Sequence, residues 1–341
     1  MNLFDLDRQD FKDLFQQWDV PSYRVDQVWN GLYKNFWFQA KEFSNLPKEL
    51  SQRLDLSFEA PIRQVLQTLR SSDRSTTKVL IELADGLAVE TVLMTYDRRK
   101  TLCVSTQVGC AMGCTFCATG QMGFKRNLSS GEIIAQILYF ERLLHQTGDR
   151  LTNIVYMGMG EPLHNYDNTL KSIDRLNQAD GWNFGARRFT LSTSGLVPRI
   201  RQLADEKRQV NLAISLHSTL DEERSKIMPV NRSYPISDLI DACKYYLDQT
   251  HRRITFEWAL IYGVNDTEEE AKRLAKLLAG LLCHVNAIPL NPTSGFSGNA
   301  TNPERAEKFK QILESNGIPC TIRMRRGIDI QAGCGQLASK Q

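Results

Sequence analysis

The stretch Gln107-Val-Gly-Cys-Ala-Met-Gly-Cys-Thr-Phe-Cys-Ala-Thr-Gly120 indicates both the fold of this chain and its chemistry. It carries three cysteines in the spacing C-x3-C-x2-C, at Cys110, Cys114 and Cys117. Cysteine thiolates are the usual ligands of iron–sulfur clusters, and a cubane [4Fe–4S] cluster takes four ligands. A tight loop with three thiolates therefore predicts a [4Fe–4S] cluster whose fourth iron is open to a small molecule.

The missing fourth cysteine distinguishes this motif from two common alternatives. A zinc site usually brings paired C-x-x-C groups, and an electron-carrying ferredoxin brings a fourth cysteine followed by proline; neither accompanies Cys117. An open iron suits a radical S-adenosylmethionine (SAM) enzyme, where it binds the amino and carboxylate groups of SAM before a 5′-deoxyadenosyl radical is released. We interpret the loop in this way, with a structural metal site or buried thiols as the alternatives.

The composition is that of an ordinary globular protein, with 42% hydrophobic and 24% charged residues among 341. We find no apolar run of about 18 residues and no signal-peptide pattern, so we expect no membrane span. Eight cysteines without a secretory signal indicate a cytoplasmic protein with functional thiols. The net charge of +3 is too small to indicate a nucleic-acid partner. Basic clusters nevertheless recur, which suits phosphate binding as well as an ordinary solvated surface. They are Arg98-Arg99-Lys100, Lys125-Arg126, Arg187-Arg188, Arg252-Arg253 and Arg323-x-Arg325-Arg326.

The sequence pattern divides the chain into four parts. Residues 1–75 predict a small helical domain, whose aromatic side chains fit either a core or an RNA contact. Residues 76–95 predict a β-hairpin that turns at Asp85-Gly86. Residues 96–330 alternate strand and helix in six βα units, which indicates an α/β fold with a parallel sheet curved into a partial TIM-like (β/α)6 barrel. Residues 331–341 form a C-terminal segment.

Polar motifs recur where the predicted parallel strands end, which is the face on which barrel active sites form. The strand at 153–157 leads into Gly158-Met-Gly160-Glu161, where glycines let the backbone approach a ligand and Glu161 can accept a hydrogen bond from the SAM amino group. Later strand ends supply Ser192, Ser215, His217 and Asn291. Such positions around one rim favour ligand contact over isolated polar residues.

Two further cysteines and one glutamate also point to chemistry. Cys103 lies on the strand that leads into the cluster loop, and glycines flank Cys334 in a segment that can present its thiol. The remaining cysteines fall in helix or strand patterns and are expected to be buried. Glu90 interrupts an apolar strand, and a carboxylate inside a site can serve as a general base.

These motifs together resemble the RlmN/Cfr family of radical SAM RNA adenine methyltransferases, and within it the RlmN type. The resemblance extends over nearly the whole chain and rests on the cluster loop, Met157-Gly-Met-Gly-Glu-Pro162, Leu191-Ser-Thr-Ser-Gly195, Ser215-Leu-His217 and Gly333-Cys-Gly-Gln-Leu337. It implies methylation at C2 of a specific adenosine in the peptidyl-transferase region of 23S rRNA and of the adenosine just 3′ of the anticodon in tRNAs. The N-terminal domain then corresponds to an accessory RNA-binding domain.

The resemblance also implies a role for each candidate residue. Cys334 would carry the methyl group as S-methylcysteine, Cys103 would resolve the RNA adduct by forming a disulfide with Cys334, and Glu90 would accept the proton. Two SAM molecules would be used per methyl, one to methylate Cys334 and one to supply the radical. The cluster ligands would be Cys110, Cys114 and Cys117, and the SAM site would contain Gly160, Glu161, Ser192, Ser215, Leu216, His217 and Asn291.

Two alternatives stay open. A Cfr-type enzyme methylates C8 of the rRNA adenine and confers antibiotic resistance with the same machinery; Gly160-Glu161-Pro162 and Arg325-Arg326-Gly327 favour the C2 type. A non-catalytic RNA- or ribosome-binding protein with a structural metal centre would leave the Gly-Glu motif and Cys334 without a purpose. We expect a monomer that receives electrons from a donor such as flavodoxin or ferredoxin.

Overall fold

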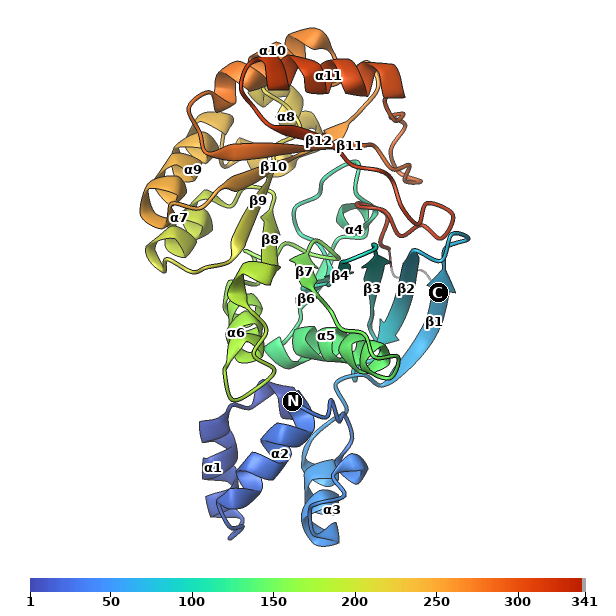
Figure 1. Cartoon of the computed structure of the whole chain (residues 1–341), viewed down its shortest axis with the longest axis vertical. Helices are drawn as coiled ribbons and strands as arrows, with labels where there is room; N and C mark the ends of the chain where they lie inside the picture. Colours follow the sequence, from blue (N-terminus) through green and yellow to red (C-terminus); the bar gives the residue numbers. More distant parts are fainter. Residues whose placement is uncertain (339–341) are drawn as a thin grey trace.

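The computed structural model describes residues 1–338, and the last three residues of the predicted C-terminal segment lie outside this range. A helical N-terminal part, an antiparallel sheet extension and an open barrel follow one another along the chain (Figure 1). The cluster loop and the C-terminal segment, far apart in sequence, both lie beside the barrel strands.

The N-terminal part consists of α1 (Arg8–Gln17), α2 (Tyr23–Tyr33) and α3 (Lys48–Ser57). Asp7 begins α1 with a capping box, because its carboxylate accepts from the backbone of Gln9 and Asp10 while the Asp10 side chain accepts from Asp7 N. Several aromatic residues of this part form its core: Phe11, Trp29 and Tyr33 are fully buried, whereas Trp37 is half-buried and Tyr23 is exposed. Tyr33 therefore packs the domain and is not free to stack on RNA bases.

A ten-stranded sheet forms the body of the molecule, in the order β1-β2-β3-β4-β7-β8-β9-β10-β11-β12. Neighbouring strands from β1 to β4 pair antiparallel, and β4 followed by β7 to β12 pair in parallel. The antiparallel strands are β1 (Gln64–Arg70), β2 (Thr76–Glu82), β3 (Ala88–Thr95) and β4 (Lys100–Cys103). The later parallel strands are β7 (Asn153–Tyr156), β8 (Phe189–Thr193), β9 (Asn211–Ser215), β10 (Ile254–Leu260), β11 (Cys283–Pro289) and β12 (Cys320–Ile322).

Helices connect the parallel strands and cover the convex side of the sheet (Figure 1). They are α5 (Ser130–His145), α6 (Tyr166–Asn177), α7 (Val197–Asp205), α9 (Ile236–Thr250), α10 (Glu268–Leu278) and α11 (Pro303–Ser315). Ser129 and Glu132 form the capping box that begins α5, as the sequence predicts. The six strand–helix units and the partial barrel are therefore confirmed.

Three features were not predicted. Strand β1 lies within residues 1–75, which were expected to be helical, and it extends the hairpin to three strands. It is an edge strand whose residues are exposed or half-buried, so its sequence lacks a strong apolar alternation. The short helix α8 (Asp221–Ile227) and the small sheet of β5 (Gln107–Gly109) and β6 (Phe124–Asn127) also escaped sequence analysis. Within residues 1–338, no helix is both long and apolar enough to cross a bilayer.

Candidate active site

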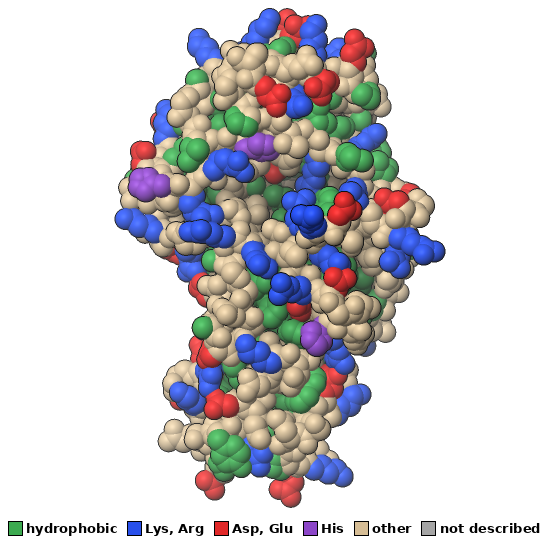
Figure 2. All heavy atoms as spheres, in the orientation of Figure 1, with side chains coloured by type: hydrophobic (Ala, Val, Ile, Leu, Met, Phe, Trp, Pro, Cys, Tyr) green, Lys and Arg blue, Asp and Glu red, His purple; other side chains and the backbone are tan. Residues whose placement is uncertain are grey.

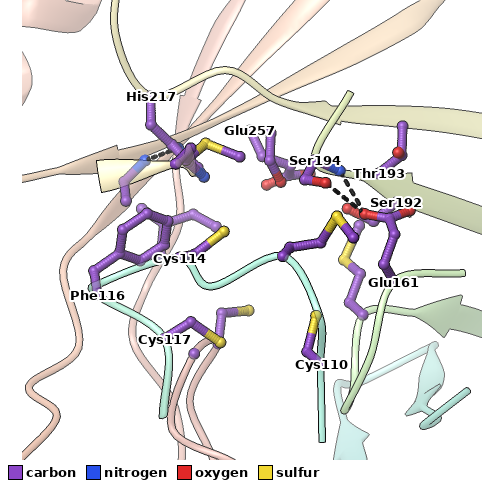
Figure 3. A pocket seen from close by; sticks show the side chains of 18 of the residues that line it. Cys110, Cys114, Phe116, Cys117, Glu161, Ser192, Thr193, Ser194, His217 and Glu257 are labelled. Atoms are coloured by element: carbon purple, nitrogen blue, oxygen red, sulfur yellow. Dashed lines mark hydrogen bonds between the residues drawn. The ribbon is translucent and has the colours of Figure 1, made fainter. Parts of the chain in front are cut away.

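The candidate site is a cavity of about 170 Å³ at the C-terminal ends of the parallel strands. Its walls come from the cluster loop, from the ends of β7 to β11 and from the C-terminal segment that carries Cys334. Figure 3 shows the three loop cysteines below the cavity, with Glu161, Ser192 and Ser194 on one side and His217 on the other. This is the barrel face on which the sequence placed the site.

The cysteine loop runs from β5 to the short helix α4 (Ala118–Gln121). Gly109 allows it to turn, because its φ is +72° and a Cβ atom there would lie 1.8 Å from the carbonyl oxygen of Gly123. Cys110 N donates to that same oxygen at 3.0 Å. All three cysteines line the cavity. Burial raises the pKa of the Cys110 thiol to about 12 and also raises the pKa of Cys114, so these thiols are neutral until a metal displaces their protons.

The donor set of the loop is three thiols that face one cavity. Cysteine thiolates are the usual ligands of iron–sulfur clusters, so these residues fit such a cluster.

Glu161 is held rigidly on the side of the cavity next to β8. Its Oε2 accepts from Ser194 N at 2.7 Å and Ser194 Oγ at 2.8 Å, and its Oε1 accepts from Leu163 N at 3.0 Å. Burial raises the pKa of Glu161, while these donors lower it. Because protein donors already occupy both oxygens, the carboxylate has little spare capacity for a ligand amino group. Its first task is to join the end of β7 to the end of β8.

Most of the other predicted SAM residues surround the cavity, as expected. Gly160, Ser192, Ser215, His217 and Asn291 all line it. The Asn291 Nδ2 donates to the Cys334 carbonyl at 3.1 Å, while its buried Oδ1 has no hydrogen-bond partner among the described residues. A buried acceptor without a partner in a cavity wall suits a ligand N–H group. The exception is Leu216, whose side chain lies fully buried in the core and not in the cavity wall.

His217 is a neutral side chain with a fixed tautomer. Its Nδ1 accepts from Ala259 N at 2.9 Å, so the ring proton is on Nε2. Burial and the nearby Arg224 lower the pKa of His217 to about 3. Phe116 from the cluster loop packs edge-on against the imidazole, with 5.0 Å between ring centroids. The residue has a left-handed φ of +61°, which turns the chain sharply after β9.

Cys103 and Cys334 line one narrow cavity of about 40 Å³ that shares Met157, Asn291 and Cys334 with the main site. Cys103 is buried on β4, and burial raises its pKa to about 12. Cys334 is exposed to the cavity; surrounding protein raises its pKa and the cation of Arg323 lowers it. All eight cysteines are free thiols, so the expected Cys103–Cys334 disulfide is not formed in this structure.

Glu90 lies on β3 near this pair but does not line either cavity. Its Oε1 pairs with Lys78 Nζ at 2.8 Å, and its Oε2 accepts from Ala338 N at 2.8 Å. The structure therefore places the predicted base beside the C-terminal segment, with both carboxylate oxygens occupied.

Sequence analysis missed Arg224 and Glu257, and it named Arg323 only as a member of a basic cluster. Arg224 of α8 is fully buried and donates to the carbonyls of Ser194, Ser215 and Leu216, which ties together the ends of β8 and β9. Glu257 on β10 lines the main cavity, and burial raises its pKa to about 7. The pKa of Arg323 is raised, mainly by the negative charge of Cys334 in its ionised form. Two of the three residues have a sequence signal: Glu257 interrupts the apolar strand 254–260, and Arg323 belongs to the basic cluster Arg323-x-Arg325-Arg326.

Comparisons with known proteins agree with this geometry. Residues 104–278 match the radical SAM superfamily, and residues 1–60 match the ribosomal RNA large subunit methyltransferase N-terminal domain. The crystal structure of a radical SAM methyltransferase from Sphaerobacter thermophilus superimposes with a TM-score of 0.97, at 47% identity and with both chains fully covered. The barrel and its three-cysteine loop therefore define a radical SAM enzyme.

Two curated relatives narrow the class. The dual-specificity RNA methyltransferase RlmN 1 of Myxococcus xanthus is 48% identical over 98% of this chain and 94% of its own. The probable dual-specificity RNA methyltransferase RlmN of Dictyoglomus thermophilum is 46% identical over 98% of this chain and 96% of its own. The chain belongs to the RlmN family of radical SAM RNA methyltransferases.

Proposed function

We propose that this enzyme methylates C2 of a specific adenosine in the peptidyl-transferase region of 23S rRNA, and of the adenosine just 3′ of the anticodon in tRNAs. The observation that carries the proposal is the narrow cavity that brings Cys103 and Cys334 together and opens onto the three-cysteine pocket. A radical SAM enzyme without a protein-bound methyl carrier needs no further pair of thiols beside the three cysteines of its cluster loop.

In this proposal, a [4Fe–4S] cluster held by Cys110, Cys114 and Cys117, together with SAM, supplies a 5′-deoxyadenosyl radical. The SAM site comprises Gly160, Glu161, Ser192, Ser215, Leu216, His217 and Asn291. The free Oδ1 of Asn291 supports this assignment, whereas the buried side chain of Leu216 restricts that residue to a backbone role.

Cys334 accepts a methyl group on Sγ and later joins the base through that carbon. Glu90 takes the proton that leaves C2, a role that requires one carboxylate oxygen to exchange its contact with Lys78 or with Ala338 N for the substrate. The Cys103 thiolate then attacks Sγ of Cys334, and the bond between Cys334 Sγ and the transferred carbon breaks. The electron pair of that bond passes to the transferred carbon, which takes up a proton and becomes the methyl group of the base. The Cys103–Cys334 disulfide forms as the methylated RNA is released. Each cycle uses two SAM molecules, and a donor such as flavodoxin or ferredoxin provides electrons.

A second, basic hollow supports an RNA substrate. It encloses about 920 Å³ at the N-terminal ends of the parallel strands and shares Met157 and Glu257 with the main site. Among residues 1–338, Glu257 is the only acidic residue in its wall, whereas five arginines line it: Arg99, Arg252, Arg253, Arg323 and Arg326. Figure 2 shows Lys and Arg side chains gathered around the hollow in the middle of the molecule. We propose that RNA phosphates bind here.

Not every predicted basic pair serves RNA. Arg126 binds Asp85 and Glu132, so it stabilises the junction between the hairpin and α5. Arg99 and Arg326 instead both lie over the Tyr96 ring, with their Cζ atoms 4.4 and 4.5 Å from the ring centroid, and all three residues line the basic hollow. We assign residues 1–75 to an accessory RNA-binding role and expect a cytoplasmic monomer.

Product analysis tests the proposal. The protein is reconstituted without oxygen and given SAM, a reductant and unmodified 23S rRNA fragment or tRNA, and the nucleosides are identified by mass spectrometry. We expect 2-methyladenosine. Formation of 8-methyladenosine would instead establish the Cfr-type activity, and absence of SAM cleavage by cluster-loaded protein would favour a non-catalytic RNA-binding protein.

A further inference from the structure

A buried ion pair lies where the antiparallel extension meets the C-terminal segment. Lys78 on β2 and Glu90 on β3 are only 8% and 5% exposed. Val92 on β3 is paired with Lys78 on one side and with Cys103 on the other. Residues paired across strands share a face, as do residues two apart on one strand. The ion pair and Cys103 therefore project from the same face of the sheet.

The two members of this pair bind the two ends of the segment that carries Cys334. Lys78 Nζ donates to the carbonyl of Gln331 at 3.1 Å, and Glu90 Oε2 accepts from the backbone N–H of Ala338 at 2.8 Å. Lys78 and Glu90 bind each other at 2.8 Å between these contacts. Cys334 lies near the middle of the span that they enclose.

Residues 331–338 form no helix or strand, so side-chain and loop contacts determine their position. On the cluster side, Ala118 N donates to Gly335 O at 2.7 Å and Thr119 Oγ1 donates to Leu337 O at 2.6 Å. On the strand side, Asn291 holds the Cys334 carbonyl. Lys78 and Glu90 supply the tethers to the sheet that carries Cys103.

Stability alone is a weak reason for such a pair. Removing two charges from water is costly, and apolar residues of similar volume often stabilise a fold equally well. The other hydrogen bonds of Lys78 and Glu90 both go to residues 331–338. Positioning of that segment therefore explains the buried pair better than stability does. Neither contact requires SAM or a cluster to be bound.

We propose that Lys78 is a positioning residue: with Glu90 it clamps residues 331–338, and the clamp sets the place of the Cys334 thiol between the SAM pocket and Cys103. The role of this placement in methyl transfer rests on the proposed function. The clamp itself is a property of the folded chain and can be measured without turnover.

Hydrogen exchange of the protein without SAM tests the clamp directly. In Lys78→Met the amides of residues 331–338 should exchange about tenfold faster or more, because a hydrogen bond from a charged donor is lost. Lys78→Arg, which retains the charge and donors, should restore most of the protection. Lys100→Met is the matched control, since Lys100 on β4 pairs with Asp149 and does not contact the segment. Equal exchange of residues 331–338 in Lys78→Met and the wild type would overturn the proposal.

A second variant covers the case in which an unpaired Glu90 destabilises the whole fold. Lys78→Met combined with Glu90→Gln removes both charges and leaves an amide oxygen to accept from Ala338. We expect faster exchange in residues 331–338 with unchanged protection in β7 to β11, and unchanged exchange in the segment would refute the clamp.

The same variants connect the clamp to catalysis. Lys78→Met should still bind iron and cleave SAM but carry less methyl on Cys334, as measured by peptide mass spectrometry. Methylation equal to that of Lys100→Met would refute the positioning role. If the wild type itself forms no S-methylcysteine, the proposed function fails while the exchange result still decides the clamp.

Discussion

Replacing Gly109 by alanine should disrupt the cluster loop far more than replacement of another glycine with the same backbone conformation. Gly109 and Gly148 have φ values of +72° and +74°. A Cβ at Gly109 would lie 1.8 Å from Gly123 O, whereas a Cβ at Gly148 would have no atom within 4 Å. Both variants incur the left-handed penalty of about 1–2 kcal/mol. Only Gly109→Ala must also move a backbone carbonyl by more than about 1 Å, since real Cβ atoms do not approach closer than 3.0 Å.

That movement breaks the hydrogen bond from Cys110 N to Gly123 O and strains the pairing of β5 with β6. The lost hydrogen bond costs about 1 kcal/mol and the crowding about 1–3 kcal/mol. We therefore expect Gly109→Ala to destabilise the protein by roughly 3–6 kcal/mol, against about 1–2 kcal/mol for Gly148→Ala.

Urea unfolding followed by circular dichroism measures the stability difference, and iron and sulfide per chain after anaerobic reconstitution measure the loop. Gly109→Ala should retain less than about half of the iron that Gly148→Ala binds, because a displaced Cys110 weakens one of three ligands. Equal urea midpoints and equal iron contents in the two variants would show that the close approach to Gly123 has no structural importance.

Five further variants have defined outcomes. Cys103→Ala should accumulate an RNA–protein adduct on denaturing gels, and normal turnover would exclude its resolving role; Cys334→Ala should form neither adduct nor methylated RNA. Glu257 has a pKa of about 7 in the folded protein against 4.5 for the ordinary side chain. As the pH rises, the unfolded chain loses this proton before the folded protein does. The free energy of unfolding of the wild type should therefore fall by roughly 3 kcal/mol between pH 4.5 and 7 relative to that of Glu257→Gln. Parallel pH profiles of the two free energies, measured by urea unfolding, would contradict this. Arg224→Met removes three hydrogen bonds to carbonyls at the ends of β8 and β9. It should lower the free energy of unfolding by about 3 kcal/mol and weaken SAM binding in equilibrium dialysis. A wild-type free energy of unfolding together with wild-type SAM affinity would argue against this role. Arg252→Gln with Arg253→Gln should lower the slope of log affinity against log salt for RNA by about 1–2, and an unchanged slope would place the RNA elsewhere.

The parallel barrel could be predicted because each of its strands is a short apolar run between turn residues and helices with clear ends. The cluster loop could be predicted because its cysteines are adjacent in sequence. Strand β1 could not, since an exposed edge strand has little apolar pattern. Its pairing with β2 depends on a neighbour that lies across a turn.

The buried charged contacts of the site could not be predicted from the sequence either. Arg224 stands in a polar run, Asp221-Glu-Glu-Arg-Ser-Lys226, that resembles an exposed helix surface, yet its side chain is fully buried. Lys78 likewise has no sequence signal that links it to Gln331, about 250 residues later. Such contacts come from tertiary folding, and local patterns do not report them.

The unequal settings of the two paired thiols bear on the timing of the reaction that we propose. Cys103 belongs to a strand, whereas Cys334 lies between two clamped ends in a segment without regular structure. Any change in the distance between the two sulfurs is therefore confined to the few residues around Cys334. Loop movements take about nanoseconds to microseconds, while enzymes typically turn over about 1–1,000 times per second. Such a local adjustment is brief within one cycle, so bond chemistry or release of the RNA should limit the rate.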